Sequence, residues 1–388
     1  MQARSNIFME TARLYYGRLR QFFDLPRCYS KVRNFKEYPK SGLTLATDLL
    51  TLFFSYRTFP DHYGPCRLWE ANKSDWKYYY GSNYHPHQRL KLSISVQQSE
   101  YRALFDDKFL CATYCKGLGL KVPHTFGVVD PDEDYRGRIR SWFEASNVER
   151  MIIKPLLGRA GMGIVLAKRI EDGITIQSAN DSVSLDRFPL KDRSIIQEYI
   201  RQHAKMSVFS PSSVNTLRIV TMMTRQGEVI IVNASMRTGA RRSFVDNFSA
   251  GGISAGVDCR TGQLKKYAYD NRWNRYERHP ESGIVFESYE IPGWERVLDF
   301  AGAVQNGFPY YRLIGSDIAI DQDGEPVLIE VNGAPDLVGL EQKAGPLFRN
   351  QIVLRTFGEY DLLVNKHQKK LLYEIRNEFD GETASKIY

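Results

Sequence analysis

The sequence predicts an α+β protein, because strand patterns and helical patterns occupy different stretches of the chain. Strand patterns run through residues 215–224, 228–236, 251–258, 313–321 and 326–332. Apolar and basic residues interleave over the first 40 residues as in an amphipathic helix, and a second helix is expected from Trp294 to Gln305, after Pro292-Gly293.

The composition is that of a globular protein large enough to form subdomains. The 388 residues are 43% hydrophobic and 25% charged, so the chain can bury a sizeable core. The net charge of +8 favours an anionic partner, but the basic residues are spread along the chain and no specific nucleic acid is expected. Five cysteines without metal-ligand spacing, and no signal-peptide pattern, predict a cytoplasmic protein with reduced thiols.

Residues 1–100 are expected to be a largely helical N-terminal region. Between residues 11 and 40, apolar side chains alternate with eight basic ones: Arg13, Arg18, Arg20, Arg27, Lys31, Arg33, Lys36 and Lys40. We favour a helix that packs on the protein with a solvated basic face. The alternative is a helix that contacts a membrane surface.

The stretch from Ser316 to Gly333 predicts two strands joined by a tight turn at Asp323-Gly324. Asp317 begins the first strand, and Glu330 and Asn332 end the second. Side chains two apart on a strand share a face, so the hairpin can bring these three oxygen ligands together. Such ligands suit Mg²⁺ bound to nucleotide phosphates. The alternative is a plain hairpin with three polar surface residues.

A glycine-rich loop follows the apolar strand that ends in Lys154-Pro155. The loop contains Gly158, Arg159, Gly161, Met162 and Gly163, and another strand follows it. Glycines let backbone N–H groups approach phosphate oxygens, and a nearby lysine adds a positive charge. No Gly-Lys-Ser/Thr is present and no helix is expected after the loop, which excludes a Walker loop and a dinucleotide fingerprint. We interpret the loop as a lid over phosphates; a simple glycine-containing hairpin is the alternative.

A third segment, from Ser194 to His203, begins as a short apolar strand and becomes polar at its end. Its backbone could pair with the edge of an adenine while apolar neighbours enclose the ring. The residues that we expect to contact the nucleotide here are Gln197, Glu198, Tyr199, Ile200 and His203.

The order of these segments resembles that of the ATP-grasp superfamily of carboxylate–amine ligases, over about residues 100–350. The order is a first lysine, strand-Lys-Pro, glycine loop, hinge and Asp…Glu-x-Asn. Finer features resemble the sugar-transfer-associated branch, which is linked to polysaccharide biosynthesis. They are residues 197–203, 214–221, 247–253 and 330–336.

The resemblance implies an ATP-grasp fold that holds the nucleotide between two subdomains. Residues 151–200 would be a small antiparallel lid, and residues 201–350 a larger α+β subdomain with the metal and substrate sites. Residues 101–150 would precede the lid and supply the first nucleotide lysine, Lys108. A family-variable region, 1–100, and a C-terminal helix and tail, 351–388, would flank this unit.

The resemblance also implies ATP with Mg²⁺, as two ions, and a reaction through an acyl-phosphate that forms a C–N bond and releases ADP and phosphate. A thiol or hydroxyl in place of the amine is an alternative acceptor. Small carboxylate and amine substrates, sugar-linked in this branch, would be the partners. A phosphotransferase on the same scaffold and a non-enzymatic RNA- or membrane-binding protein are the alternatives. The predicted metal ligands argue against the non-enzymatic one, and the oligomeric state is left open.

One position departs from the pattern of many relatives, which place an arginine two residues before the metal-binding aspartate. Here that residue is Gly315. We expect Arg218, with Arg237 second, to supply the missing charge to the reaction. A structural ion pair is the alternative for either arginine. Beyond Arg237, a polar loop is expected to bind substrate through Arg241, Arg242, Asn247 and Ser249.

Overall fold

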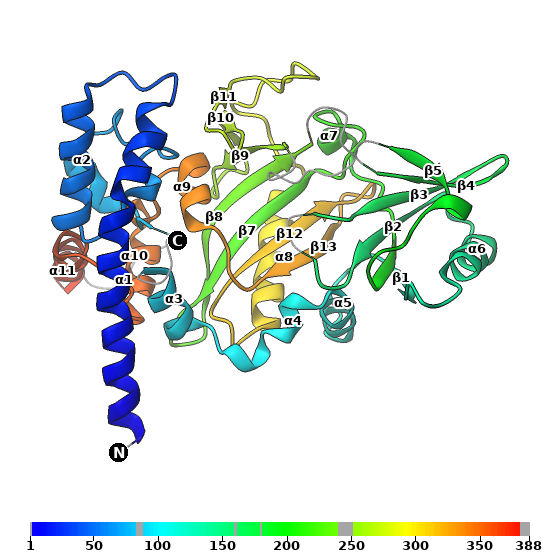
Figure 1. Cartoon of the computed structure of the whole chain (residues 1–388), viewed down its shortest axis with the longest axis horizontal. Helices are drawn as coiled ribbons and strands as arrows, with labels where there is room; N and C mark the ends of the chain where they lie inside the picture. Colours follow the sequence, from blue (N-terminus) through cyan, green and yellow to red (C-terminus); the bar gives the residue numbers. More distant parts are fainter. Residues whose placement is uncertain (1, 83–87, 159–160, 179–180, 240–250, 381–388) are drawn as a thin grey trace.

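A computed structural model describes residues 2–82, 88–158, 161–178, 181–239 and 251–380 (Figure 1). Two antiparallel sheets lie side by side, and helices gather on the far side of the larger sheet and around the smaller one. Strands and helices are therefore segregated, which confirms the predicted α+β class. The domain boundaries proposed from the sequence stay a prediction.

The smaller sheet has six strands in the order β1-β6-β2-β3-β4-β5. Helix α6 covers one of its faces, where Ile139 and Phe143 pack against strand residues such as Ile153. The segments of this part are β1 (Thr125–Val129), α6 (Tyr135–Ala145), β2 (Arg150–Pro155), β3 (Val165–Ile170), β4 (Gly173–Gln177), β5 (Ser182–Ser184) and β6 (Ser194–Glu198). The sheet thus takes in β1, which precedes the predicted lid in the chain.

The larger sheet has seven strands in the order β11-β10-β9-β8-β7-β12-β13. Its segments are α7 (Ala204–Ser207), β7 (Thr216–Met223), β8 (Val229–Thr238), β9 (Ile253–Val257), β10 (Leu264–Tyr269), β11 (Arg275–Tyr276), α8 (Trp294–Gly307), β12 (Leu313–Ile320), β13 (Pro326–Asn332) and α9 (Leu337–Ala344). The five strand patterns and the helix predicted from residue 294 are all present. Strands β10 and β11 were not predicted.

Helices cover both faces of the larger sheet, which explains why its central strands are apolar at nearly every position. On β7, Leu217 and Ile219 face α8, whereas Val220 and Met222 face α9 and the C-terminal helices. This alternation places Arg218 on the face away from α8.

The remaining helices are α1 (Gln2–Arg33), α2 (Gly42–Phe54), α3 (Gln88–Val96), α4 (Ala103–Asp106), α5 (Lys108–Gly117), α10 (Gln351–Glu359) and α11 (Lys366–Asp380). The sequence predicted a single helix after Phe348. The structure corrects this to two, because the chain turns between them at Asp361, where φ is +53°.

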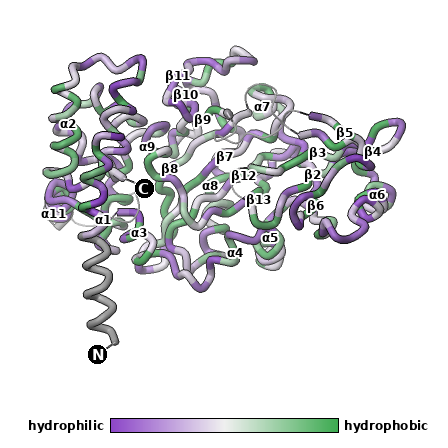
Figure 2. The backbone as a smooth tube through the Cα atoms, viewed as in Figure 1, coloured by the Kyte–Doolittle hydropathy of each residue, from purple (hydrophilic) through white to green (hydrophobic). Residues whose placement is uncertain are grey.

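Polar and apolar residues alternate along these helices, as Figure 2 shows for α1 and α2. None of the helices in the described ranges combines the length and the apolar character that crossing a bilayer requires.

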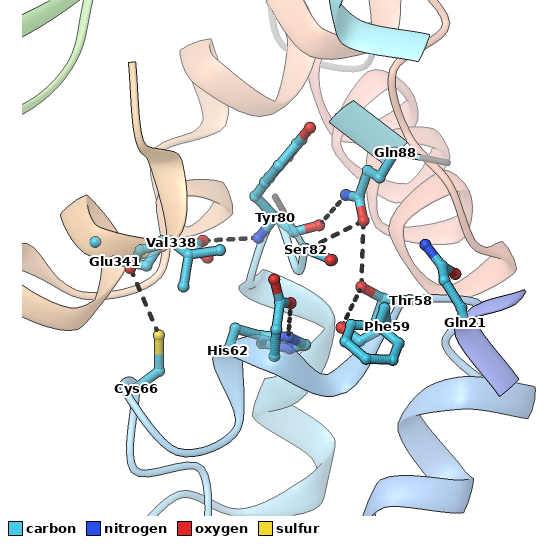
Figure 3. A network of polar contacts seen from close by, with 12 residues as sticks. Gln21, Thr58, Phe59, His62, Cys66, Tyr80, Ser82, Gln88, Val338 and Glu341 are labelled. Atoms are coloured by element: carbon cyan, nitrogen blue, oxygen red, sulfur yellow. Dashed lines mark hydrogen bonds and ion pairs between the residues drawn. The ribbon is translucent and has the colours of Figure 1, made fainter. Parts of the chain in front are cut away.

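A buried polar network joins the N-terminal region to α9 (Figure 3). The Glu341 carboxylate accepts the backbone N–H of Tyr80 at 2.7 Å and that of Leu347 at 3.1 Å. Gln88 donates to the Tyr80 carbonyl and accepts from the Ser82 N–H at 3.1 Å. Residues 80–82 and Gln88 are thereby fixed against the larger subdomain.

Glu341 should make the stability depend on pH. Its side chain is 2% exposed, and burial raises its pKa to about 8 in spite of the backbone donors. The folded protein therefore keeps a proton that the unfolded chain releases near pH 4.5, so stability falls as pH rises from there through about 8. We expect the free energy of unfolding to fall by up to about 1.4 kcal/mol per pH unit between pH 6 and 8.

Denaturant unfolding at pH 6, 7 and 8 measures this slope. Glu341→Gln should flatten it, because an amide does not titrate, whereas Glu374→Gln, which changes an exposed carboxylate on α11, should leave it unchanged. Equal slopes for the wild type and Glu341→Gln would contradict a proton held at this site.

Candidate functional site

The predicted hairpin is formed by β12 and β13 and brings its three oxygen ligands together. Asp317 pairs with Glu330 across the strands, and Gly315 pairs with Asn332. The register shifts between Asp317 and Ile318, so a bulge in the hairpin lies beside the two carboxylates. The Asn332 amide lies 3.5 Å from an Asp317 oxygen. The three side chains therefore share one face at one end of the hairpin.

Asp317 is held between two arginines from neighbouring strands. Arg218 donates through Nε to Asp317 Oδ1 and through Nη2 to Oδ2, the latter at 2.7 Å. Arg237 Nη1 reaches Oδ2 at 3.1 Å. Asp317 and Arg218 are 5% and 8% exposed. Burial alone would raise the Asp317 pKa, but the two guanidiniums outweigh it and lower that pKa below its usual value.

Gly315 leaves the space through which Arg218 reaches Asp317. A Cβ on Gly315 would lie 3.2 Å from Arg218 Cδ and 3.1 Å from the Pro335 Cβ. An arginine at residue 315 and the observed Arg218 side chain would therefore compete for one volume. Arg218, from the adjacent strand, therefore lies beside Gly315, and its role in a reaction stays a prediction.

Glu330 differs from Asp317 in its surroundings. Burial and the nearby Asp317 charge raise its pKa, against the attraction of Lys108, Arg218 and Lys154. Within the described part of the chain, no side chain forms a hydrogen bond with the Glu330 carboxylate. Two close carboxylates with an amide oxygen beside them form a hard-oxygen set that fits Mg²⁺, which would relieve their repulsion.

Lys108 and Lys154 reach the same place from the other side. Lys154 lies on β2 and donates to Gln197 Oε1 at 3.1 Å. Lys108 begins α5, which Asp107 caps, and its ammonium donates to the Gly158 carbonyl at 2.7 Å. Burial lowers the pKa of Lys108 in spite of the Glu330 charge. Lys108 therefore holds the glycine loop over the site.

A cavity of about 120 Å³ lies between these groups. Among its lining residues are Lys108, Lys154, Gly158, Gly161, Met162, Gln197, Arg237, Asp317, Leu328 and Glu330. Pockets that bind small molecules usually measure about 300–1,000 Å³. The cavity is smaller than this, so it would have to widen to hold a nucleotide. Gly163, with φ at +73°, lies next to Met162 in this loop.

The predicted hinge residues divide between two places. Gln197 faces the first cavity, whereas Glu198, Tyr199 and Ile200 line a second one of about 750 Å³ beside Asp321. The backbone N–H of Glu198 already donates to the His124 carbonyl at 2.9 Å, so an adenine edge would have to use the residues that follow. His203 lines none of the cavities described here, and its ring caps α7 by accepting the Lys205 N–H.

A third cavity, of about 820 Å³, opens on the other side of Arg237 and Glu330, which also line the first. Arg218 and Asn332 contribute to it, and so do residues from before α5 that the sequence analysis did not identify: Ser93, Gln97, Ser99 and Arg102. Two side chains from this stretch bind the backbone that follows Asn332. Gln97 donates to the Gly333 carbonyl, and Arg89 donates to the Pro335 carbonyl at 2.9 Å. Gly333–Pro335 follow the predicted strand 326–332, so their backbone carbonyls need partners outside it. This need was the signal in the sequence that could have indicated such contacts.

Five predicted site residues lie outside the described part of the chain: Arg159, Arg241, Arg242, Asn247 and Ser249. The described residues contain no cluster of three or more His, Cys, Asp or Glu side chains that could hold a metal ion. A metal at Asp317 and Glu330 would therefore need Asn332 and oxygen atoms of a ligand to complete its coordination.

Comparison with known proteins gives one family. A family model described as sugar-transfer associated ATP-grasp matches residues 88–352. No curated protein matches.

The chain is also similar to several solved structures. Over 67% of its length it aligns with 61% of a D-Ala:D-Ser ligase from Enterococcus faecalis, at 14% identity and a TM-score of 0.41. Over 68% it aligns with 68% of a D-alanyl-alanine synthetase A from Vibrio cholerae, at 11% identity and a TM-score of 0.40.

An N5-carboxyaminoimidazole ribonucleotide synthetase from Thermotoga maritima aligns over 65% of this chain, at 11% identity and a TM-score of 0.36. The chain spans 54% of that protein, about half its length.

Proposed function

Because the chain belongs to the sugar-transfer associated ATP-grasp family and has the ATP-grasp fold, we propose that it is an ATP-dependent ligase that joins a carboxylate to an amine. One observation carries the proposal: Asp317 and Glu330 line one cavity with Lys108, Lys154 and the glycine loop. Anionic oxygen ligands and lysines around one space suit a triphosphate whose charge must be neutralised.

The proposed reaction has two steps. A substrate carboxylate oxygen attacks the γ-phosphorus of ATP, and ADP leaves as the acyl-phosphate forms. The amine nitrogen then attacks the acyl carbon, phosphate leaves with the electrons of the C–O bond, and the amine loses a proton. Mg²⁺ held by Asp317, Glu330 and Asn332 would neutralise phosphate oxygens. Lys108 and Lys154 bind the phosphates, and an arginine offers its guanidinium to the oxyanion of the second step.

The third cavity is the proposed place for the carboxylate and the amine. It meets the nucleotide cavity at Arg237 and Glu330, so a carboxylate bound there would lie beside the transferred phosphate. Hydroxyls and amides of Ser93, Gln97, Ser99 and Asn332 line it. Such groups suit hydroxyl-rich molecules, which agrees with sugar-linked substrates, as the family description suggests.

Nucleotide binding is the first test. MgATP should stabilise the folded protein by mass action, by about 2.7 kcal/mol at a hundredfold excess over its Kd, and raise the melting temperature. Lys154→Gln should reduce the shift because it removes a charge from the cavity, whereas Lys168→Gln, on an exposed part of β3, should not. A folded wild-type protein that shows no shift at millimolar MgATP would contradict the proposal.

The products distinguish a ligase from a phosphotransferase. A ligase releases ADP and free phosphate in amounts that rise when carboxylate and amine are both supplied. A phosphotransferase would release ADP while the phosphate stays on its acceptor. A screen of carboxylate–amine pairs, with ADP and phosphate measured separately, decides between them.

A further inference from the structure

Helices α1 and α2 present large apolar side chains to solvent. The exposed fraction is 58% for Leu19, 42% for Phe22, 72% for Phe23, 43% for Leu50 and 62% for Phe54. We call these five residues the aromatic patch. Single exposed apolar residues are common on protein surfaces, whereas contiguous ones mark an interaction site.

The patch is continuous across the two helices. The Phe22 ring lies 6.0 Å from that of Phe23 and 6.2 Å from that of Phe54. Leu19 lies one helical turn before Phe23, and Leu50 one turn before Phe54, so both helices extend the patch along the same side.

Basic side chains are exposed along α1 and in the turn that follows it. In the described side chains from residue 16 to residue 40, the exposed charged residues are Arg20, Arg27, Lys31, Arg33, Lys36 and Glu37. The single acidic member, Glu37, pairs with Arg67 at 2.8 Å. Asp24 is half-buried. The exposed charge along this part of the chain is therefore mostly positive, and Arg20 and Arg27 lie within about one helical turn of the patch residues Leu19 and Phe23.

We propose that the aromatic patch docks on the surface of an anionic lipid bilayer. Aromatic and leucine side chains of an amphipathic helix enter the headgroup boundary, and basic residues beside them attract anionic headgroups. A second copy of the chain fits less well, because a twofold interface would bring this cationic patch against itself.

Docking in this way leaves the candidate active site accessible. Helices α1 and α2 lie at one end of the molecule, and the smaller sheet lies at the other (Figure 1). The proposal does not depend on the proposed ligase activity, because it is carried by a different part of the chain.

Sedimentation of the full chain with vesicles tests the proposal. The protein should sediment with vesicles of phosphatidylcholine and phosphatidylglycerol, remain in solution with pure phosphatidylcholine, and be released by about 0.5 M salt, where exposed charges are screened. Arg20→Gln/Arg27→Gln should weaken binding roughly 30-fold, at about 1 kcal/mol per basic residue near the surface. Arg260→Gln/Arg272→Gln removes two exposed charges elsewhere and should bind as the wild type does.

A second pair of variants tests the apolar contribution. Leu19→Ser/Phe23→Ser should lose binding, whereas Ile170→Ser/Val285→Ser, which changes two apolar residues that are exposed elsewhere, should retain it. Circular dichroism checks that each variant is folded. Absence of sedimentation with anionic vesicles overturns the proposal. So does a wild-type dimer by light scattering that becomes monomeric in Leu19→Ser/Phe23→Ser, since a second copy would then cover the patch.

Discussion

Glu330→Gln is expected to reduce turnover by about 10²-fold or more, the loss typical when one preorganised charged group is removed from a reacting centre. The amide keeps the shape of the side chain but loses the charge that would hold Mg²⁺ against the phosphates. Stability should not fall. Burial and the Asp317 charge already raise the pKa of Glu330, so a neutral group relieves an unfavourable interaction. We therefore expect an unchanged or higher melting temperature.

Glu325→Gln is the matched control for this variant. It lies in the turn of the same hairpin, where the carboxylate pairs with Arg296 at 2.7 Å on the surface. Turnover should be that of the wild type. Asp317→Asn should lose activity as well, but it should also destabilise the fold by about 3–5 kcal/mol, because two guanidiniums lose their buried partner. Near-normal rates in Glu330→Gln and Asp317→Asn would mean that the hairpin is structural.

Arg237→Ala is expected to cost about 3–4 kcal/mol of transition-state stabilisation with a small effect on folding. We now favour Arg237 over Arg218 as the cation that would meet the reacting groups, the reverse of the order expected from the sequence. Arg237 lines both cavities and donates to one Asp317 oxygen, whereas Arg218 donates to both carboxylate oxygens and is more deeply buried. Arg237→Lys should recover part of the rate, because a point charge replaces only part of a guanidinium fork.

Arg218→Ala distinguishes a structural ion pair with Asp317 from contact with the reacting groups. Removing it leaves Asp317 buried with one partner, so we expect a stability loss of about 3–5 kcal/mol. The measurements are kcat per folded molecule, ATP affinity and denaturant unfolding for the Arg218 and Arg237 variants. If Arg237→Ala keeps its rate per folded molecule while Arg218→Ala loses it, the original order is right and Arg218 is the residue that contacts the reacting groups.

Local patterns account for the part of the fold that could be predicted. The hairpin of β12 and β13 is visible in the sequence because its strands are adjacent and its turn contains Asp323-Gly324, with φ at +81° for the glycine. The short β10 has too mixed a pattern to be recognised, since Lys265 and Lys266 lie in its centre.

The contacts that organise the site are not local. Arg218 and Asp317 are 99 residues apart and meet because β7 pairs with β12 in one particular register. The pattern of apolar residues within a strand does not indicate which other strand lies next to it in the sheet. The same holds for Lys108, whose contact with the glycine loop depends on where α5 packs, and for Gln97, which fixes the backbone after Asn332.

The ion pairs of Asp317 affect the order in which the metal ion and the nucleotide bind. Before any ligand arrives, this carboxylate already has two counterions of its own, so a free divalent cation has to compete with two guanidiniums for its oxygens. A nucleotide that brings its own cation avoids this problem, because its phosphates offer the released guanidinium an anionic group at the moment the carboxylate changes partner. The net charge around Asp317 then stays nearly constant while the nucleotide and its cation bind. Titration with Mg²⁺ alone should therefore give no detectable binding here, and metal and nucleotide should bind with strong positive cooperativity.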